Sequence, residues 1–378
     1  MEWNARRLSD YMQFDNFNVT ECVKGALMPM ALVATANRFG TITVGFNNQY
    51  NGFLNVLNAR KTELAQTVQS KLSQNPNYTG SRNAGVKLAW QYEKADIEMG
   101  GRGSANWTTS EQKEILNSKT GTVSGVEGHH QRNVVAHPEH QADPNNIKFY
   151  KSKQDHLEQG HDGNFQNESN APLINKNKML EKTNNRRVLI NEIKGASISA
   201  TIGFGVAFTI SAITELARIG IASVEMGEFI GHSLRAGIEG GAISTITYGA
   251  GRLVSSMLQN HGVDLLTKVR TLVNFSAVGT ISIILISTYQ FIKMKVNGIE
   301  TSVAFREVGK QALFSISVLA VSIITQGVYG GCAGIIVSTG VGLAVLTVGV
   351  INTVHQGKLE RQIKEYAIEE YKPLFVLA

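Results

Sequence analysis

The sequence has very little cysteine and long stretches without charge. Its two cysteines, Cys22 and Cys332, lie far apart and lack metal-ligand spacing, which excludes a disulfide scaffold and favours a reducing compartment. The first apolar stretch, residues 26–35, is short and contains Pro29, so no secretory signal is expected. The net charge of +6 is mild and suits a polyanion or an acidic membrane surface.

Charge is absent from three runs in the C-terminal half. Residues 195–214, 271–292 and 311–354 form uncharged runs of 20, 22 and 44 residues. A bilayer core needs about 20 helical residues, so the first two runs each fit one membrane pass and the third fits two, turning near residues 329–332. Small residues at four-residue spacing, such as Gly227 and Gly231, would let such helices approach closely. A soluble helical core that is apolar on all sides is the alternative.

Basic residues flank these runs on one side of the expected membrane. They precede the first run, fill the loop between the second and third, and follow the last: Arg186, Arg187, Lys194, Lys293, Lys295, Arg306, Lys310, Lys358, Arg361 and Lys364. The positive-inside rule makes that side cytoplasmic. Residues 215–270 mix charges into an apolar pattern and stay open between an amphipathic or re-entrant segment and further passes.

The polar N-terminal half contains six of the nine histidines, all between His129 and His161. Residues 122–126 and 134–136 are expected strands around the doublet His129-His130. The dipeptide Asp143-Pro144 predicts a helix start, and that helix would run through Ile147, Phe149 and Tyr150 to His156 before ending at Gly160. His156 and His161 can converge only if the helix ends between them. Upstream, residues 55–74 predict an amphipathic helix and residues 38–53 a hairpin.

The histidine window, with its flanks 99–107 and 161–167, resembles the HNH endonucleases and most specifically the GHH-type nuclease domains of bacterial polymorphic toxins. The resemblance covers residues 90–170. It implies a small ββα-metal (HNH) nuclease domain. Together with the uncharged runs, this predicts an α+β fold in which that domain is followed by an all-α, glycine-rich, transmembrane helical region. The expected regions are an N-terminal region of unknown role, the nuclease domain, a polar linker, a membrane-embedded helical region and a C-terminal amphipathic helix: residues 1–89, 90–174, 175–194, 195–354 and 355–378.

The resemblance also implies roles for single residues. His129, His156 and His161 are the expected metal ligands, and His130 is the expected general base. Asn146 would orient the loop that holds the base, with the adjacent Asn145 as the alternative register. Three histidines suit Zn²⁺ or another transition ion better than Mg²⁺, although Mg²⁺ stays open. The candidate phosphate contacts are Arg102, Arg132 and Lys148.

Other interpretations of these residues stay open. The three histidines could form a structural zinc site, which would need a fourth protein ligand. His137 and His140 could be additional ligands, but the Pro138 between them favours a surface loop. Trp107 is expected in the core rather than on a base-stacking surface.

Together these features predict a metal-dependent endonuclease that hydrolyses phosphodiester bonds, with DNA favoured, anchored in the bacterial inner membrane. The nuclease domain would lie on the cytoplasmic side and act in defence or as a toxin, with an immunity or regulatory protein as a possible partner. The alternative is a membrane pore-forming or channel-like effector with a regulatory or degenerate HNH domain.

Overall fold

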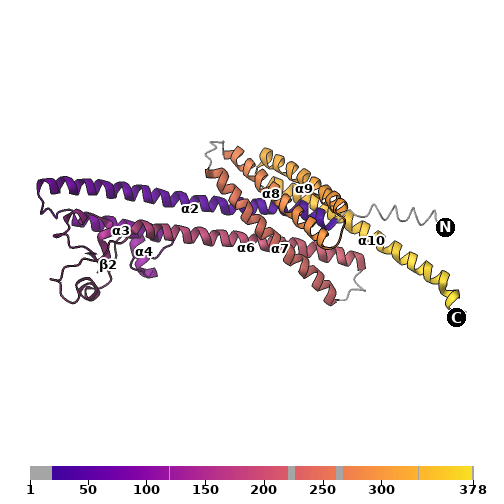
Figure 1. The fold of residues 1–378 in the computed structure, drawn as a ribbon, viewed down its shortest axis with the longest axis horizontal. Helices are drawn as coiled ribbons and strands as arrows, with labels where there is room; N and C mark the ends of the chain where they lie inside the picture. Colours follow the sequence, from indigo (N-terminus) through magenta and orange to yellow (C-terminus); the bar gives the residue numbers. More distant parts are fainter. Residues whose placement is uncertain (1–18, 119, 220–225, 261–266, 331, 377–378) are drawn as a thin grey trace. The chain divides into compact units, whose positions relative to one another are not determined.

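The computed structural model describes residues 19–118, 120–219, 226–260, 267–330 and 332–376, and these residues are mostly helical (Figure 1). They form two compact units. The first, Thr41–Glu192, contains helices and a small sheet and is called the mixed unit. The second combines Met1–Gly40 with Ile193–Ala378 and is called the helical unit. Two helices, α2 (Val19–Gln74) and α6 (Lys176–Ile219), belong to both.

Within the mixed unit, α2 and α6 are joined by polar side chains. Asn184 donates to Asn47 at 2.9 Å, and Asn191 donates to Thr43 at 3.0 Å. The helix expected over residues 55–74 is confirmed as part of α2, whereas the hairpin expected over residues 38–53 is wrong. Polar residues of this stretch, such as Thr43 and Asn47, face α6, whose first part is the stretch expected as a polar linker.

The sheet has two antiparallel strands, β1 (Glu127–His130) and β2 (Ile147–Tyr150), with His130 opposite Ile147. The α+β expectation is therefore confirmed, but neither strand lies where it was expected. Residues 122–126 form coil and a turn before β1, which begins at Glu127. Residues 134–136 form a turn, and Asp143 caps a single 3-10 turn, η2 (Pro144–Asn146), instead of a long helix. The side chains of Ile147 and Phe149 are buried, and pairing with β1 outweighs the helix-start signal.

Aromatic residues form the core that supports the sheet. Trp90, on α3 (Arg82–Glu98), lies 4.1 Å from Phe149 of β2 and 5.4 Å from Trp107, measured between ring centroids. Trp107 is 1% exposed, so its expected place in the core is confirmed. It precedes α4 (Thr109–Asn117), which begins with a capping box.

The helical unit contains part of α6 together with α7 (Met226–Asn260), α8 (Thr267–Val296), α9 (Thr301–Tyr329) and α10 (Ala333–Val376). Among the residues that the structure describes, four helices are long and apolar enough to cross a membrane: Lys176–Ala217, Ser276–Val296, Thr301–Tyr329 and Ala333–Ile363. The turn expected near residues 329–332 is confirmed, with Gly330 at φ 71° after α9. Residues 215–270, for which the sequence left several structures open, contain the helix α7, which is not one of the four candidate spans.

The four candidate spans expose most of their apolar surface. Only 22% of the most apolar window is buried in three of them and 28% in the fourth. Apolar helices that leave so much surface uncovered are suited to contact with lipid rather than with water. The buried interior includes the first part of α2, where Met30 and Val33 pack against Leu319 of α9. The sequence did not indicate that this stretch belongs with the helical unit.

The helices approach one another closely at some glycines, but not at Gly227 and Gly231, where close packing was expected. A Cβ on Gly203 of α6 would lie 2.3 Å from the carbonyl oxygen of Gly240 on α7. A Cβ on Gly334 would lie 2.5 Å from the carbonyl oxygen of Ser322, so α9 and α10 also pack tightly. Gly227 and Gly231 have open space around them. Spacing alone therefore did not distinguish a packing glycine from an uncovered one.

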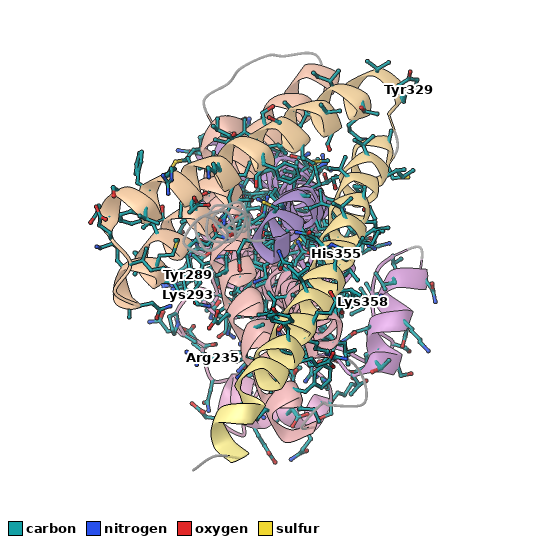
Figure 2. The ribbon with its side chains drawn as sticks, turned by 90° about the vertical axis from the view of Figure 1, so that its right-hand side faces the viewer. Arg235, Tyr289, Lys293, Tyr329, His355 and Lys358 are labelled. Atoms are coloured by element: carbon teal, nitrogen blue, oxygen red, sulfur yellow. The ribbon has the colours of Figure 1, made fainter. Side chains whose placement is uncertain are left out.

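One polar group links α7 to α8 in this unit. Glu239 accepts from Lys293 at 2.5 Å and lies 3.4 Å from Arg235. In Figure 2, Arg235, Tyr289 and Lys293 appear on the same side of the helices. The charges of Arg235 and Glu239, which interrupt the apolar pattern of α7, are thus partly neutralised by each other and by Lys293.

Candidate metal centre and cleft

Three histidines converge beside the sheet. His129 lies on β1, His156 opens the short π-helical turn η3 (His156–Gly160), and His161 follows it. Each offers one ligand atom, and these atoms lie within 4.8 Å of one another. The break expected at Gly160 is confirmed, and it turns the chain so that His161 meets the other two rings.

Hydrogen bonds orient two of the three rings. A carboxylate and a carbonyl can only accept, so His156 donates through Nδ1 to Glu127 at 2.7 Å. His161 likewise donates through Nδ1 to the carbonyl oxygen of Asn167 at 2.9 Å. When either ring is neutral, its lone pair therefore lies on Nε2, the nitrogen left for a metal ion. A partner that fixes the tautomer of a ligand histidine is a common feature of metal sites.

The environment of His129 favours the neutral ring that a metal requires. Burial and the neighbouring histidines lower the pKa of His129 to about 3. Its Nδ1 lies 2.9 Å from Nε2 of His156, and its buried Nε2 has no hydrogen-bond partner among the described residues. Three imidazoles, one of them with an unsatisfied buried nitrogen, fit a divalent transition ion, and nitrogen ligands of tetrahedral zinc lie roughly 3.4 Å apart.

His130 lines the same cleft, which has a volume of about 370 Å³ and is bordered by all three convergent histidines. Its Nε2 lies 3.3 Å from the carbonyl oxygen of Gln141, so Nε2 carries the proton and Nδ1 the lone pair. Burial lowers the pKa of His130, and Arg82 lowers it further, although the bond to Gln141 acts in the opposite direction. The ring is therefore neutral at pH 7, as a base must be before it accepts a proton.

Asn146 is fully buried and closes the loop between the doublet and β2. Its Oδ1 accepts from the backbone N–H of Arg132 at 2.7 Å, and its Nδ2 donates to the carbonyl oxygens of Arg132 and His140 at 3.2 Å each. Asn145 instead accepts from the backbone N–H of Lys176. The geometry thus gives the loop-fixing place to Asn146 rather than to Asn145.

The three cations expected to contact phosphate do not line this cleft. The guanidinium of Arg132 approaches His140, and Lys148 lies over the ring of Tyr150. Arg102 is exposed outside the lining. Among the described residues, the cation that lines the cleft is Arg82, the first residue of α3. The sequence around Arg82 did not indicate that it belongs to the site, because Arg82 reaches the cleft only through the packing of α3.

Two further positioning residues were missed. Glu127 occupies the same strand face as His129, so the two-residue period of a strand could have indicated it. Gln141 is buried, accepts from Ser81 N–H at 2.8 Å and donates to the Tyr78 carbonyl at 2.7 Å. It thereby holds the carbonyl that orients His130. His137 and His140 lie on or beside the 3-10 turn η1 (Pro138–His140), near Glu139, outside the triad.

The comparisons with known proteins agree with this geometry. Residues 78–151 match a family model described as GHH signature containing HNH/Endo VII superfamily nuclease toxin. No curated protein and no solved structure matches the chain. The match includes His129, His130 and Asn146 and ends before His156 and His161, which the structure adds through their positions. The resemblance is therefore confirmed for residues 78–151, the part of the chain that matches this family model.

Proposed function

We propose that the mixed unit is a metal-dependent endonuclease that hydrolyses phosphodiester bonds, with DNA as its substrate. The observation that carries the proposal is the convergence of His129, His156 and His161 within 4.8 Å, beside His130 in one cleft. A bound transition ion, with Zn²⁺ favoured by the three imidazoles, would stabilise negative charge on the phosphate and the leaving oxygen. A fourth protein ligand would be needed for a closed structural zinc site, and the cluster within the described residues contains three.

The residues of the chain would act in distinct ways. Nδ1 of His130 takes a proton from water, because the Gln141 carbonyl holds the proton of this ring on Nε2. Asn146 keeps the loop after the doublet in place through its three backbone hydrogen bonds. Glu127 keeps His156 in the tautomer that presents Nε2.

The helical unit would anchor this domain to a membrane. The four candidate spans are apolar and mostly uncovered. Arg186, Arg187 and Lys194 precede the uncharged part of the first span, and by the positive-inside rule they favour the cytoplasm for the side from which the nuclease domain leads into it. Lys293 and Lys295 end α8, and Arg306 and Lys310 lie within α9, so these four do not form the expected loop. A bacterial inner membrane with the nuclease on its cytoplasmic side, in a defence or toxin role with an immunity or regulatory partner, is the arrangement we propose.

Cleavage of supercoiled plasmid DNA by the full-length protein in detergent tests the activity. Wild type should cut the plasmid when Zn²⁺, Mn²⁺ or Ni²⁺ is added after removal of metal with EDTA, and His130→Ala should be inactive while binding as much metal. His161→Ala should lose both metal and activity. An active His130→Ala variant would refute its role as the base.

A second candidate function follows from the four candidate spans themselves. The helical unit could be a pore-forming or channel-like effector, with the nuclease domain as a regulatory module. Expression of full-length His130→Ala in cells separates the two functions. Loss of toxicity assigns the effect to the nuclease, whereas unchanged toxicity with leakage of a small dye assigns it to the helices.

A further inference from the structure

An exposed aromatic ring forms part of the cleft wall. Phe165 is 56% exposed and lines the cleft together with the metal-site histidines. Its ring makes edge contacts with His156 and His161, with centroid distances of 5.7 and 5.3 Å. Leaving more than half of a phenylalanine side chain exposed to water is unfavourable in free energy, because burial of apolar surface is what stabilises the protein. The ring is thus available to a ligand in the cleft.

The turn that carries Phe165 is well fixed. Asp162 and Gly163 adopt positive φ values of 48° and 80°, and the side chain of Asn167 donates to the carbonyl oxygen of His161 at 2.9 Å. The backbone N–H of Asn167 also donates to the carbonyl oxygen of Asn164 at 2.9 Å. A ring held in place before binding loses little conformational freedom on contact with a ligand.

The other features of the cleft suit a nucleotide. Within the described part of the chain the Arg82 guanidinium makes no hydrogen bond or ion pair, although it lines the cleft. Amides from Asn133, Gln166 and Asn167 add donors and acceptors. The volume of about 370 Å³ falls within the range of pockets for small ligands and suits one nucleotide with its base turned outwards.

We propose that the cleft binds an unpaired nucleotide, with its base stacked on Phe165 and a neighbouring phosphate at Arg82. This proposal rests on the proposed nuclease function and narrows its substrate to single-stranded or locally melted nucleic acid. Aromatic side chains bind bases of any sequence through stacking, and a cation binds the backbone whatever the base. Trp107 cannot serve this purpose, since it is 1% exposed.

The test measures binding without cleavage. Full-length protein in EDTA is titrated into a fluorescein-labelled oligothymidine of about 12 nucleotides, within the usual site size for single strands. A second probe has the same length and phosphates but no bases. Wild type should prefer the probe with bases by roughly 5- to 150-fold, the range for one stacked base. A blunt duplex of the same length should bind more weakly than the single strand.

Variants assign the preference to the ring. Phe165→Ala and Phe165→Leu should remove it, Phe165→Trp should keep it, and the exposed apolar control Val135→Ala, which does not line the cleft, should leave it unchanged. Arg82→Gln should weaken binding of both probes equally and lower the salt dependence by about one phosphate contact. The Leu variant retains an apolar group against the histidines, so it separates stacking from support of the metal site.

The outcomes for this proposal and for the nuclease function are distinct. An equal preference for bases in wild type and Phe165→Ala, or tighter binding of the duplex, would overturn the nucleotide proposal even if plasmid DNA is cut. A ring-dependent preference without any metal-dependent cleavage would leave the binding site in place and remove the nuclease function.

Discussion

The two units satisfy their buried polar groups in opposite ways. In the mixed unit the partners are far apart along the chain, as with Glu93 and Lys176, which meet at 2.8 Å. In the helical unit several hydroxyl groups bond to their own helix: Ser282 and Ser315 each donate to the carbonyl four residues earlier. Local satisfaction suits a helix whose surroundings are apolar on every side, because no water is available there.

The difference indicates what specifies each unit. Long-range polar pairs tolerate few alternative arrangements, so the mixed unit can hold histidines from β1 and η3 in one geometry. In the helical unit, helices approach closely at small residues such as Gly203 and Gly240. Mutations should therefore act through lost polar partners in one unit and through surface polarity or packing in the other.

The largest effect is expected at the buried ion pair of the mixed unit. Lys176→Met should lower the free energy of unfolding of this unit by about 3–5 kcal/mol, because the carboxylate of Glu93 stays buried without its charge partner. Tryptophan fluorescence in a urea titration would report it, since Trp90 and Trp107 lie in this core. Arg60→Met, which breaks the exposed pair with Glu63, should cost less than about 1 kcal/mol.

The same pair predicts a pH dependence of stability. Burial alone would raise the pKa of Glu93, but the charge of Lys176 and hydrogen bonds from Lys176, Ser104 and Trp107 lower it overall. A carboxyl group with a lower pKa in the folded state stabilises the fold above its unfolded pKa, roughly 4.3, and that contribution is lost as the pH falls through the folded value. Equal acid sensitivity of wild type and Glu93→Gln would contradict this.

The next prediction tests whether the helical unit spans a membrane, by comparing exposed apolar residues of the two units. Val321, near the centre of the uncharged part of α9, is 53% exposed, and Val135 of the mixed unit is 73% exposed. Val321→Lys should cost about 3 kcal/mol in membrane insertion and reduce retention in the pellet after alkaline carbonate washing. Val135→Lys should leave retention unchanged. If the wild-type protein were released from the membrane by the carbonate wash, the helical unit would be a soluble helical bundle.

A smaller effect is expected at the positioning carboxylate of the metal site. Glu127→Gln should weaken metal binding by roughly 10- to 100-fold, because a neutral amide holds His156 less firmly than a carboxylate does. Isothermal titration with Zn²⁺ measures the affinity. Glu158→Gln removes the same charge from an exposed residue on η3 that bonds Gln154, and it should change the affinity little. Equal losses in both variants would reduce the effect to general electrostatics.

Sequence patterns predicted the convergent histidines, because their spacing around Gly160 and the family resemblance pointed to the same residues. They failed where tertiary pairing decided the local structure. Asp143-Pro144 is a sound helix start, yet the side chains of Ile147 and Phe149 gain more as a strand against β1. The four candidate spans were predictable, since an uncharged run of about 20 residues or more has the length and composition of a membrane-spanning helix.

Contacts between distant parts of the chain lay beyond the sequence. Arg82 belongs to the cleft only because α3 packs beside the sheet, and Gln141 orients His130 through a backbone carbonyl that any residue could supply. The first part of α2 is apolar but short and contains Pro29, so it did not read as a core helix. Its burial depends on residues more than 150 positions away in the sequence, among them Val278 and Ile283 of α8 and Leu319 of α9.

The smallest effect tests whether close packing specifies the helical unit. A Cβ at Gly203 would lie 2.0 Å from the Ser244 hydroxyl oxygen and 2.3 Å from the Gly240 carbonyl oxygen. The backbone of α7 cannot move away cheaply, so Gly203→Ala should cost about 1–3 kcal/mol despite the better helix propensity of alanine. Gly205, two residues along the same helix, has nothing within 4 Å of its Cβ position, so Gly205→Ala should be neutral or stabilise by up to about 1 kcal/mol. Thermal unfolding of the full-length protein in detergent, followed by circular dichroism, compares the two variants. The same shift for both would mean that helix propensity, rather than the α6–α7 contact, governs this part of the molecule.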